Sequence, residues 1–204
     1  MRTITIKKDV YTFNELDYAA KQHAIQELSQ EVYYDSCYED FVRMGEILGI
    51  EIDTHQVRLM NGKTRQDPSI WWSGFYSQGD GLSFDGTYSY AKGAVKAMKA
   101  ETNDAELIRI AQELQAVQRK HFYRLEARIK SDGDNWIKVS VEDREDNWRD
   151  IRDAESEITE LMRDFASWMY LSLKKEYEYQ TSEEAIVEMC EANEWEFDEN
   201  GVMQ

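Results

Sequence analysis

The chain has 204 residues, of which 42% are hydrophobic and 12% aromatic, and it carries a net charge of −17. That apolar content excludes an intrinsically disordered chain, and no stretch holds the roughly 18 to 20 apolar residues of a membrane span. Residues 139–204 contain 20 acidic and 6 basic side chains, which argues against direct binding of nucleic acid or anionic membranes there.

The first part of the chain combines short strand patterns with amphipathic helices. Leu16, Ala20 and Ala24 recur every four residues and place an apolar stripe on one helix face. Gly49 follows the next helical pattern, where glycine is a common C-terminal stop. We expect a strand at residues 3–6, a helix from Thr12 or Asn14 to about residue 30, a helix over about 38–48, and strand residues between 50 and 59.

Residues 69–90 form the most distinctive part of the sequence. Aromatic and polar residues alternate on both sides of Gly79-Asp80-Gly81, which predicts a β-hairpin.

A second hairpin and several helices are expected in the remainder of the chain. Leu125, Ala127 and Ile129 alternate with charged residues, which predicts a strand. A turn at residues 131–134 follows, and residues 136–141 are predicted to form the second strand of the hairpin. Helices are expected over 91–99, 104 to about 122, about 146–177, and 182 to about 191, with a short edge strand within 195–201. These patterns predict a single α+β domain over residues 1–204, with antiparallel hairpins packed against several helices and one long amphipathic C-terminal helix.

The loop of the first hairpin is one candidate site. Its glycines let a ligand approach the backbone, its aromatic rings offer stacking surfaces, and two aspartates could contact a cation. A tight turn whose aromatic residues enter the core explains the same residues without a ligand. The spacing of an EF-hand is absent, so no metal is expected. The residues considered are Trp71, Trp72, Ser77, Gln78, Gly79, Asp80, Gly81 and Asp85.

A row of carboxylates on the long C-terminal helix is the second candidate. The row consists of Asp146, Asp150, Asp153, Glu157, Glu160 and Asp164. Steps of three and four residues hold them on one helical face over roughly 27 Å. Such a row could imitate a nucleic-acid backbone and bind the basic groove of a protein that handles DNA or RNA. An ordinary solvated face is the alternative, and Arg149, Arg152 and Arg163 lie near enough to neutralise part of the row.

No motif of a known catalytic or cofactor site occurs in the sequence. His23, His55 and His121 are isolated, and Cys37 and Cys190 lie far apart in no metal-ligand spacing. A nucleophile elbow, a phosphate loop and a dinucleotide fingerprint are also absent. We therefore expect no cofactor and no catalytic residue, although carboxylates distant in sequence could still form an enzyme site.

Three stretches of the chain carry a resemblance to known proteins. They are residues 11–16, residues 73–86, and residues 184–186 together with 193–201, and the Ser-Gln-Gly-Asp-Gly run at residues 77–81 is the most specific part. Together they resemble a family of small acidic proteins encoded by bacteriophages and prophages. The resemblance spans most of the chain and implies a context rather than a particular chemistry.

The resemblance and the acidic row together lead to the expected function. Small acidic phage proteins can disarm host nucleases, which implies a phage-encoded inhibitor of a host defence system of the anti-CRISPR or anti-restriction type. Its partner would be a protein with a basic nucleic-acid-binding surface in the host bacterial cytosol. Two alternatives stay open: a small-ligand-binding protein or enzyme that uses Gln78, Asp80 and Asp85, and an antitoxin-like partner of a basic toxin. The oligomeric state also stays open.

Overall fold

The computed structural model describes residues 8–133, 135–145 and 150–204. The chain forms two compact units: a central unit, Asp35–Leu173, and a terminal unit made of the residues up to Tyr34 together with Lys174–Gln204. The boundary at Leu173 falls inside a single helix, so the single domain expected over residues 1–204 stays a prediction. The strand expected at residues 3–6 lies outside the described residues.

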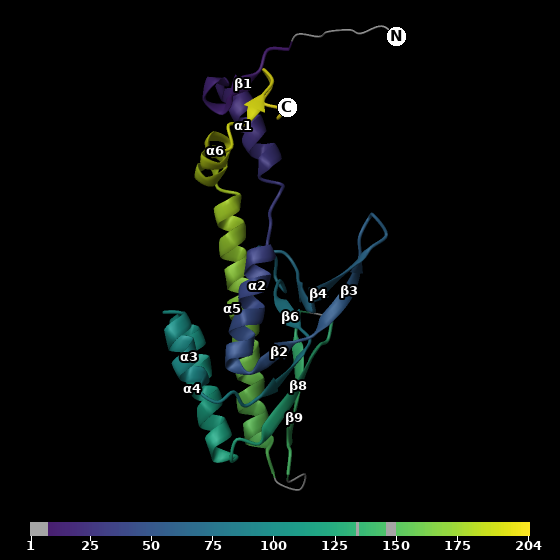
Figure 1. The fold of residues 1–204 in the computed structure, drawn as a ribbon, viewed down its shortest axis with the longest axis vertical. Helices are drawn as coiled ribbons and strands as arrows, with labels where there is room; N and C mark the ends of the chain where they lie inside the picture. The colour runs from purple at the N-terminus through teal and green to yellow at the C-terminus, as the bar shows by residue number, and fades with distance from the viewer. Residues whose placement is uncertain (1–7, 134, 146–149) are drawn as a thin grey trace. The chain divides into compact units, whose positions relative to one another are not determined.

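A four-stranded antiparallel sheet organises the central unit (Figure 1). Its strands, in spatial order, are β2 (Ile50–Ile52), β7 (Gly86–Ser89), β8 (Leu125–Ser131) and β9 (Ile137–Asp143). β8 and β9 form a hairpin paired over seven residues each, which confirms the second expected hairpin. Side chains alternate between the two faces, so Leu125, Ala127 and Ile129 are buried while Arg128 and Lys130 are exposed.

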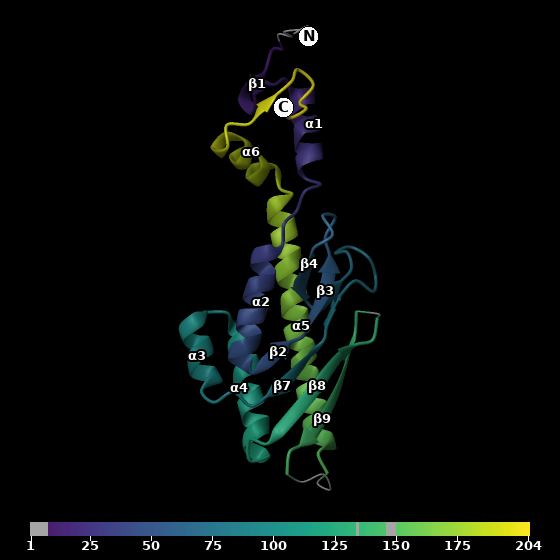
Figure 2. The ribbon, with the colours of Figure 1, turned by 45° about the vertical axis from the view of Figure 1, so that its right-hand side comes forward.

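Helices cover one face of this sheet, as Figures 1 and 2 show. They are α2 (Asp35–Leu48), α4 (Ala105–Lys120) and the first part of α5 (Arg152–Gln180), with α3 (Ala94–Glu101) packed beside α4. The Phe165 ring of α5 lies 5.9 Å from Phe84 and 5.8 Å from Trp168, measured between ring centroids. These aromatic contacts form the centre of the core. No helix in the described parts of the chain combines the length and apolar character needed to cross a membrane.

Two smaller hairpins complete the central unit. β3 (Thr54–Arg58) pairs with β4 (Thr64–Pro68), and β5 (Ile70–Trp72) pairs with β6 (Leu82–Phe84). The second pair confirms the hairpin expected around Gly79-Asp80-Gly81, and the chain then leaves it to form β7. The sequence did not indicate β4, because its residues are polar and show no apolar alternation.

The long C-terminal helix is confirmed, but its predicted start was wrong. α5 begins at Arg152, since Asp150 and Ile151 before it are not helical, and residues 146–149 lie outside the described residues. The Asp150 carboxylate accepts hydrogen bonds from the Arg152 backbone N–H at 3.2 Å and from its Nε at 3.0 Å. This local turn competes with another helical turn and leaves Asp150 ahead of the helix.

The terminal unit is built from both ends of the described chain. α1 (Tyr18–Leu28), α6 (Glu183–Ala192), and the strand pair β1 (Tyr11–Thr12) and β10 (Glu196–Phe197) surround a core of their own. β10 confirms the edge strand expected within residues 195–201. The buried core cluster consists of Phe13, Leu16, Ala20, Ala24, Ile186, Cys190 and Phe197.

The start of α1 also differs from the prediction. Thr12 and Glu15 form a capping box around a short 3-10 turn instead of starting the α-helix. Asp17 then caps α1, because its carboxylate accepts a hydrogen bond from the Ala20 backbone N–H at 2.8 Å.

Candidate functional site

Trp71 and Trp72 of the candidate hairpin loop lie in different surroundings. The Trp72 ring stacks on Phe75 with 4.9 Å between centroids, and its indole N–H donates to the Tyr38 hydroxyl at 3.0 Å. Trp71 is more exposed, and its ring lies 5.9 Å from that of His55. One aromatic ring thus packs within the fold, whereas the other is available at the surface.

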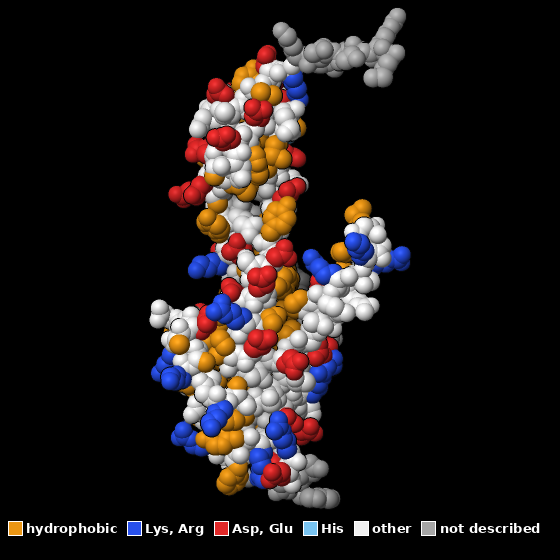
Figure 3. Space-filling view, in the orientation of Figure 1, with side chains coloured by type: hydrophobic (Ala, Val, Ile, Leu, Met, Phe, Trp, Pro, Cys, Tyr) orange, Lys and Arg blue, Asp and Glu red, His pale blue; other side chains and the backbone are white. Residues whose placement is uncertain are grey.

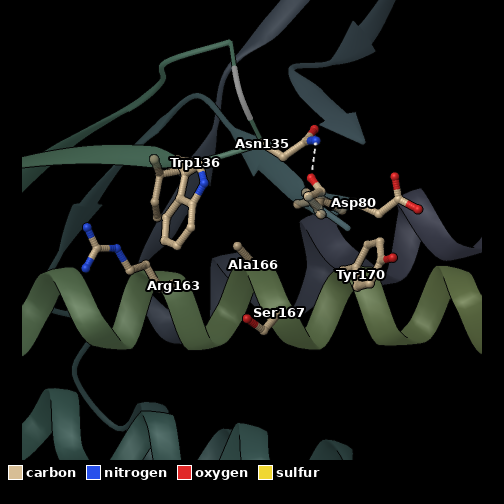
Figure 4. Close-up of a pocket in the computed structure, with 11 residues that line it drawn as sticks. Asp80, Asn135, Trp136, Arg163, Ala166, Ser167 and Tyr170 are labelled. Atoms are coloured by element: carbon tan, nitrogen blue, oxygen red, sulfur yellow. Dashed lines mark hydrogen bonds between the residues drawn. The ribbon is translucent and has the colours of Figure 1, made fainter. Parts of the chain in front are cut away.

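Asp80 holds the loop together through hydrogen bonds inside the chain. Its carboxylate accepts from the Ser77 backbone N–H at 2.6 Å and from the Ser73 hydroxyl at 3.2 Å. The Asn135 side-chain amide adds two further hydrogen bonds. It donates to the Ser73 hydroxyl at 2.8 Å and to the Gly79 carbonyl at 3.2 Å (Figure 4). These bonds support the structural explanation of the loop.

Asp85 bonds to a different part of the fold. Its carboxylate accepts from the Ser131 backbone N–H at 2.8 Å and contacts Lys130 of β8. Gln78 is exposed at the loop. The structure therefore does not gather Gln78, Asp80 and Asp85 around one ligand. Among the described residues, no group of three or more His, Cys, Asp and Glu side chains is placed to hold a metal ion.

A cleft of about 230 Å³ lies between the loop, the start of β9 and α5 (Figure 4). Arg163 lies 5.8 Å from the centre of the exposed Trp136 ring on one side of it. Tyr170 lies on the other side and donates its hydroxyl proton to the Gly74 carbonyl at 3.0 Å. Partial burial and the nearby Asp80 carboxylate raise the pKa of Tyr170. The sequence analysis missed this cleft because its walls come from three separate segments.

The acidic row is only partly arranged as expected. Asp146 lies outside the described residues, and Asp150 precedes α5. Hydrogen bonds from Arg152 lower the pKa of Asp150 to about 2, so this carboxylate stays ionised. The remaining residues, Asp153, Glu157, Glu160 and Asp164, lie on α5 with the expected spacing.

Besides Asp150, which pairs with Arg152 at 2.6 Å, three carboxylates of the row form ion pairs within the chain. Glu157 pairs with Lys120 at 3.1 Å, Glu160 pairs with Arg163 at 2.7 Å, and Asp164 pairs with Arg109 at 2.5 Å. Arg109 and Lys120 belong to α4, so two of these pairs join the adjoining helices. The row is therefore partly neutralised, as the solvated-face alternative requires.

Helix α4 extends the acidic surface in a way that the sequence analysis missed. Arg109 also binds Glu106 at 2.6 Å and Glu113 at 2.8 Å, and these hydrogen bonds, with that of Asp164, raise the pKa of its guanidinium. Glu106 and Glu113 are seven residues apart and so share one face of α4. We name Glu106, Glu113, Asp153, Glu157, Glu160 and Asp164 the α4–α5 acidic face.

The α4–α5 acidic face keeps an excess of negative charge. Its six carboxylates face four cations: Arg109, Lys120 and Arg163 form ion pairs with them, and Arg152 lies near Asp153. A groove of about 530 Å³ runs between the two helices here and is lined by Arg109, Glu157 and Asp164 among others. Acidic side chains thus border a groove on the surface of the central unit.

Comparison with protein families places the chain in one group. The model of a family described as a domain of unknown function, DUF8835, matches residues 33–183. The chain belongs to this family. The DUF8835 match contains the whole central unit, and with it the hairpin loop and the α4–α5 acidic face. No curated protein and no solved structure matches the chain.

Proposed function

We propose that the chain is an acidic binding protein whose α4–α5 acidic face occupies the basic surface of a nucleic-acid-handling protein. The observation that carries this proposal is the gathering of six carboxylates against four cations on two adjoining helices. Neighbouring side chains on such a helix face are about 5–6 Å apart. Lysine and arginine side chains that normally contact phosphates can therefore meet several carboxylates at once.

The internal ion pairs are compatible with this role. Glu157, Glu160 and Asp164 stay partly exposed, so their carboxylate oxygens can accept further hydrogen bonds from a partner. Ion pairs between exposed side chains contribute at most about 1 kcal/mol, so a partner's cations can share or replace them. The pairs also restrict the side chains before binding, which lowers the entropy lost in the complex.

The resemblance to small acidic phage and prophage proteins favours a host defence nuclease as the partner. A restriction or CRISPR nuclease in the cytosol of the bacterial host has the required basic groove. An antitoxin-like role against a basic toxin would use the same face and differ in the partner alone.

The proposal is tested by capture from a bacterial host lysate, followed by measurement on the purified partner. The test variant carries Asp153→Asn, Glu157→Gln and Glu160→Gln. The matched control carries Glu46→Gln, Glu51→Gln and Glu142→Gln, three exposed carboxylates of the same unit and the same total charge change. We expect the wild type and the control to retain a basic nucleic-acid-binding protein that the test variant loses.

Two further measurements make this result specific. Binding of the purified partner should weaken steeply as salt rises, since exposed charges are screened over about 8–10 Å. Added nucleic acid should compete with the chain for the partner. Equal binding by the test variant and the wild type would overturn the proposal.

A further inference from the structure

The terminal unit has an apolar groove that is separate from the α4–α5 acidic face. It has a volume of about 460 Å³ and lies between the end of α1, the end of α5 and α6. Its apolar lining includes Leu28, Tyr33, Tyr179, Met189, Trp195 and Met203. Volumes of this size are typical of binding pockets.

Large apolar side chains around this groove are exposed to solvent. Tyr33 is 65% exposed, Tyr179 60%, Met203 49% and Met189 37%. Single exposed apolar residues are common on protein surfaces, but a contiguous group around a concave surface indicates an interaction site. Methionine side chains are flexible and adapt to differently shaped partners.

The groove is formed before any partner binds. The Gln180 side chain accepts a hydrogen bond from the Tyr33 backbone N–H at 3.0 Å and donates to the Tyr33 carbonyl at 2.7 Å. This pair of bonds fixes the Tyr33 wall against the end of α5. Trp195 and Leu28 pack against the core cluster of the terminal unit, so the floor is also held in place.

The charge around the groove selects the kind of partner. Glu31 and Glu188 line it, and residues 1–34 and 174–204 together contain 15 acidic and 6 basic side chains. Figure 3 shows acidic and hydrophobic side chains close together over α1 and α6, with few basic ones. An acidic segment would be repelled here, whereas a segment with lysine or arginine beside its apolar face would be attracted.

We propose that this groove binds a basic amphipathic helix of a partner protein. Ala185 and Ala192 lie seven residues apart on the face of α6 that lines the groove, and their short side chains leave room for a second helix beside the flexible Met189. Apolar residues spaced by three and four positions on that helix would enter the groove. Its flanking lysine or arginine residues would contact Glu31 and Glu188.

The test uses the full chain and a labelled synthetic peptide of about 18 residues, roughly five helical turns. The peptide contains only leucine and lysine, with leucine at helical spacing on one face. Fluorescence anisotropy gives its affinity for the wild type and for a variant with Tyr179→Ser and Met189→Ser. We expect the peptide to bind this variant at least tenfold more weakly than the wild type. A second variant, with Glu31→Gln and Glu188→Gln, should bind the peptide more weakly and with a smaller dependence on salt.

Matched controls separate the groove from general attraction to an acidic protein. Tyr18→Ser with Met60→Ser changes the same residue types at exposed positions outside the groove and should leave the affinity within twofold. The variant with Asp153→Asn, Glu157→Gln and Glu160→Gln on the α4–α5 acidic face should also bind the peptide with an affinity within twofold of the wild type. A peptide of equal composition but scrambled order should bind at least tenfold more weakly. Circular dichroism melting shows whether each variant remains folded.

Two results would overturn the inference. One is equal affinity of the peptide for the wild type and for the folded Tyr179→Ser, Met189→Ser variant. The other is self-association of the chain in sedimentation equilibrium that this variant abolishes, since the occupant would then be a second copy.

Discussion

Asp80 is the residue whose role in the hairpin loop can be separated most directly from ligand binding. Its carboxylate accepts from the Ser77 N–H and the Ser73 hydroxyl, so Asp80→Ala removes two charge-assisted hydrogen bonds. We expect the free energy of unfolding to fall by about 1–2 kcal/mol in urea denaturation. Gln78→Ala, at an exposed neighbouring position, should change it by less than about 0.5 kcal/mol. An unchanged stability of Asp80→Ala would speak against the structural role.

The buried phenol of Tyr88 should make the stability of the central unit decrease at alkaline pH. Burial raises the pKa of its phenol to about 12, above about 10 in the unfolded chain. The folded state therefore holds this proton more tightly, and the resulting stability is present below pH 10 and lost as the pH rises toward 12. Between pH 9 and 11.5, the wild type should lose about 2 kcal/mol more unfolding free energy than Tyr88→Phe. Parallel pH profiles of the two proteins would contradict this.

At the scale of elements, the turn between α2 and β2 depends on Gly49. Its φ is +87°, and a Cβ placed there would lie 2.1 Å from the Ser89 carbonyl oxygen. Gly62 has a similar φ of +80° but open space around it. Gly62→Ala should therefore lower the free energy of unfolding by about 1 kcal/mol, the cost of placing an alanine in the left-handed region with no steric clash. Gly49→Ala should lower the free energy of unfolding by at least about 2 kcal/mol more than Gly62→Ala, because the backbone must shift to admit the Cβ. Thermal and urea unfolding measure both variants. Equal losses in the two variants would contradict this prediction.

The elements that the sequence predicted well are those whose pattern is local. The alternation around Gly79-Asp80-Gly81 and the apolar stripe of α5 were sufficient to predict the hairpin and the helix. β4 was missed because its stability comes from pairing with β3 and not from its own residues. The start of α5 depended on a side-chain turn at Asp150 that periodicity does not reveal.

Candidate sites built from several elements were predicted less well. The spacing of Glu157, Glu160 and Asp164 correctly put them on one helix face. It could not show that α4 lies beside them and adds Glu106 and Glu113, because periodicity describes one helix at a time. The cleft beside Trp136 and the groove beside Tyr179 likewise combine segments that are distant in sequence.

At the scale of the whole molecule, each of the two units has a core of its own. Phe197 is fully buried in the core cluster of the terminal unit, with its ring 6.1 Å from that of Phe13. Phe197→Ala should cost about 3–5 kcal/mol in this unit. Because Phe197 belongs to the core cluster of the terminal unit, hydrogen exchange should show faster exchange in α1 and α6 and little change in β8. Equal loss of protection in β8 would instead indicate one cooperative unit.

The pairing of β1 with β10 has a consequence for the synthesis of the protein. Tyr11 and Phe197 are partners in this sheet, and Ala24 shares a core with Ile186. At about 5–20 residues per second, a ribosome needs roughly 10 to 30 s to make the intervening stretch of about 160 residues. During that interval the apolar side of α1 has none of its α6 and β10 neighbours, so a nascent chain exposes it to chaperones and proteases well after the strands of the central sheet have been made.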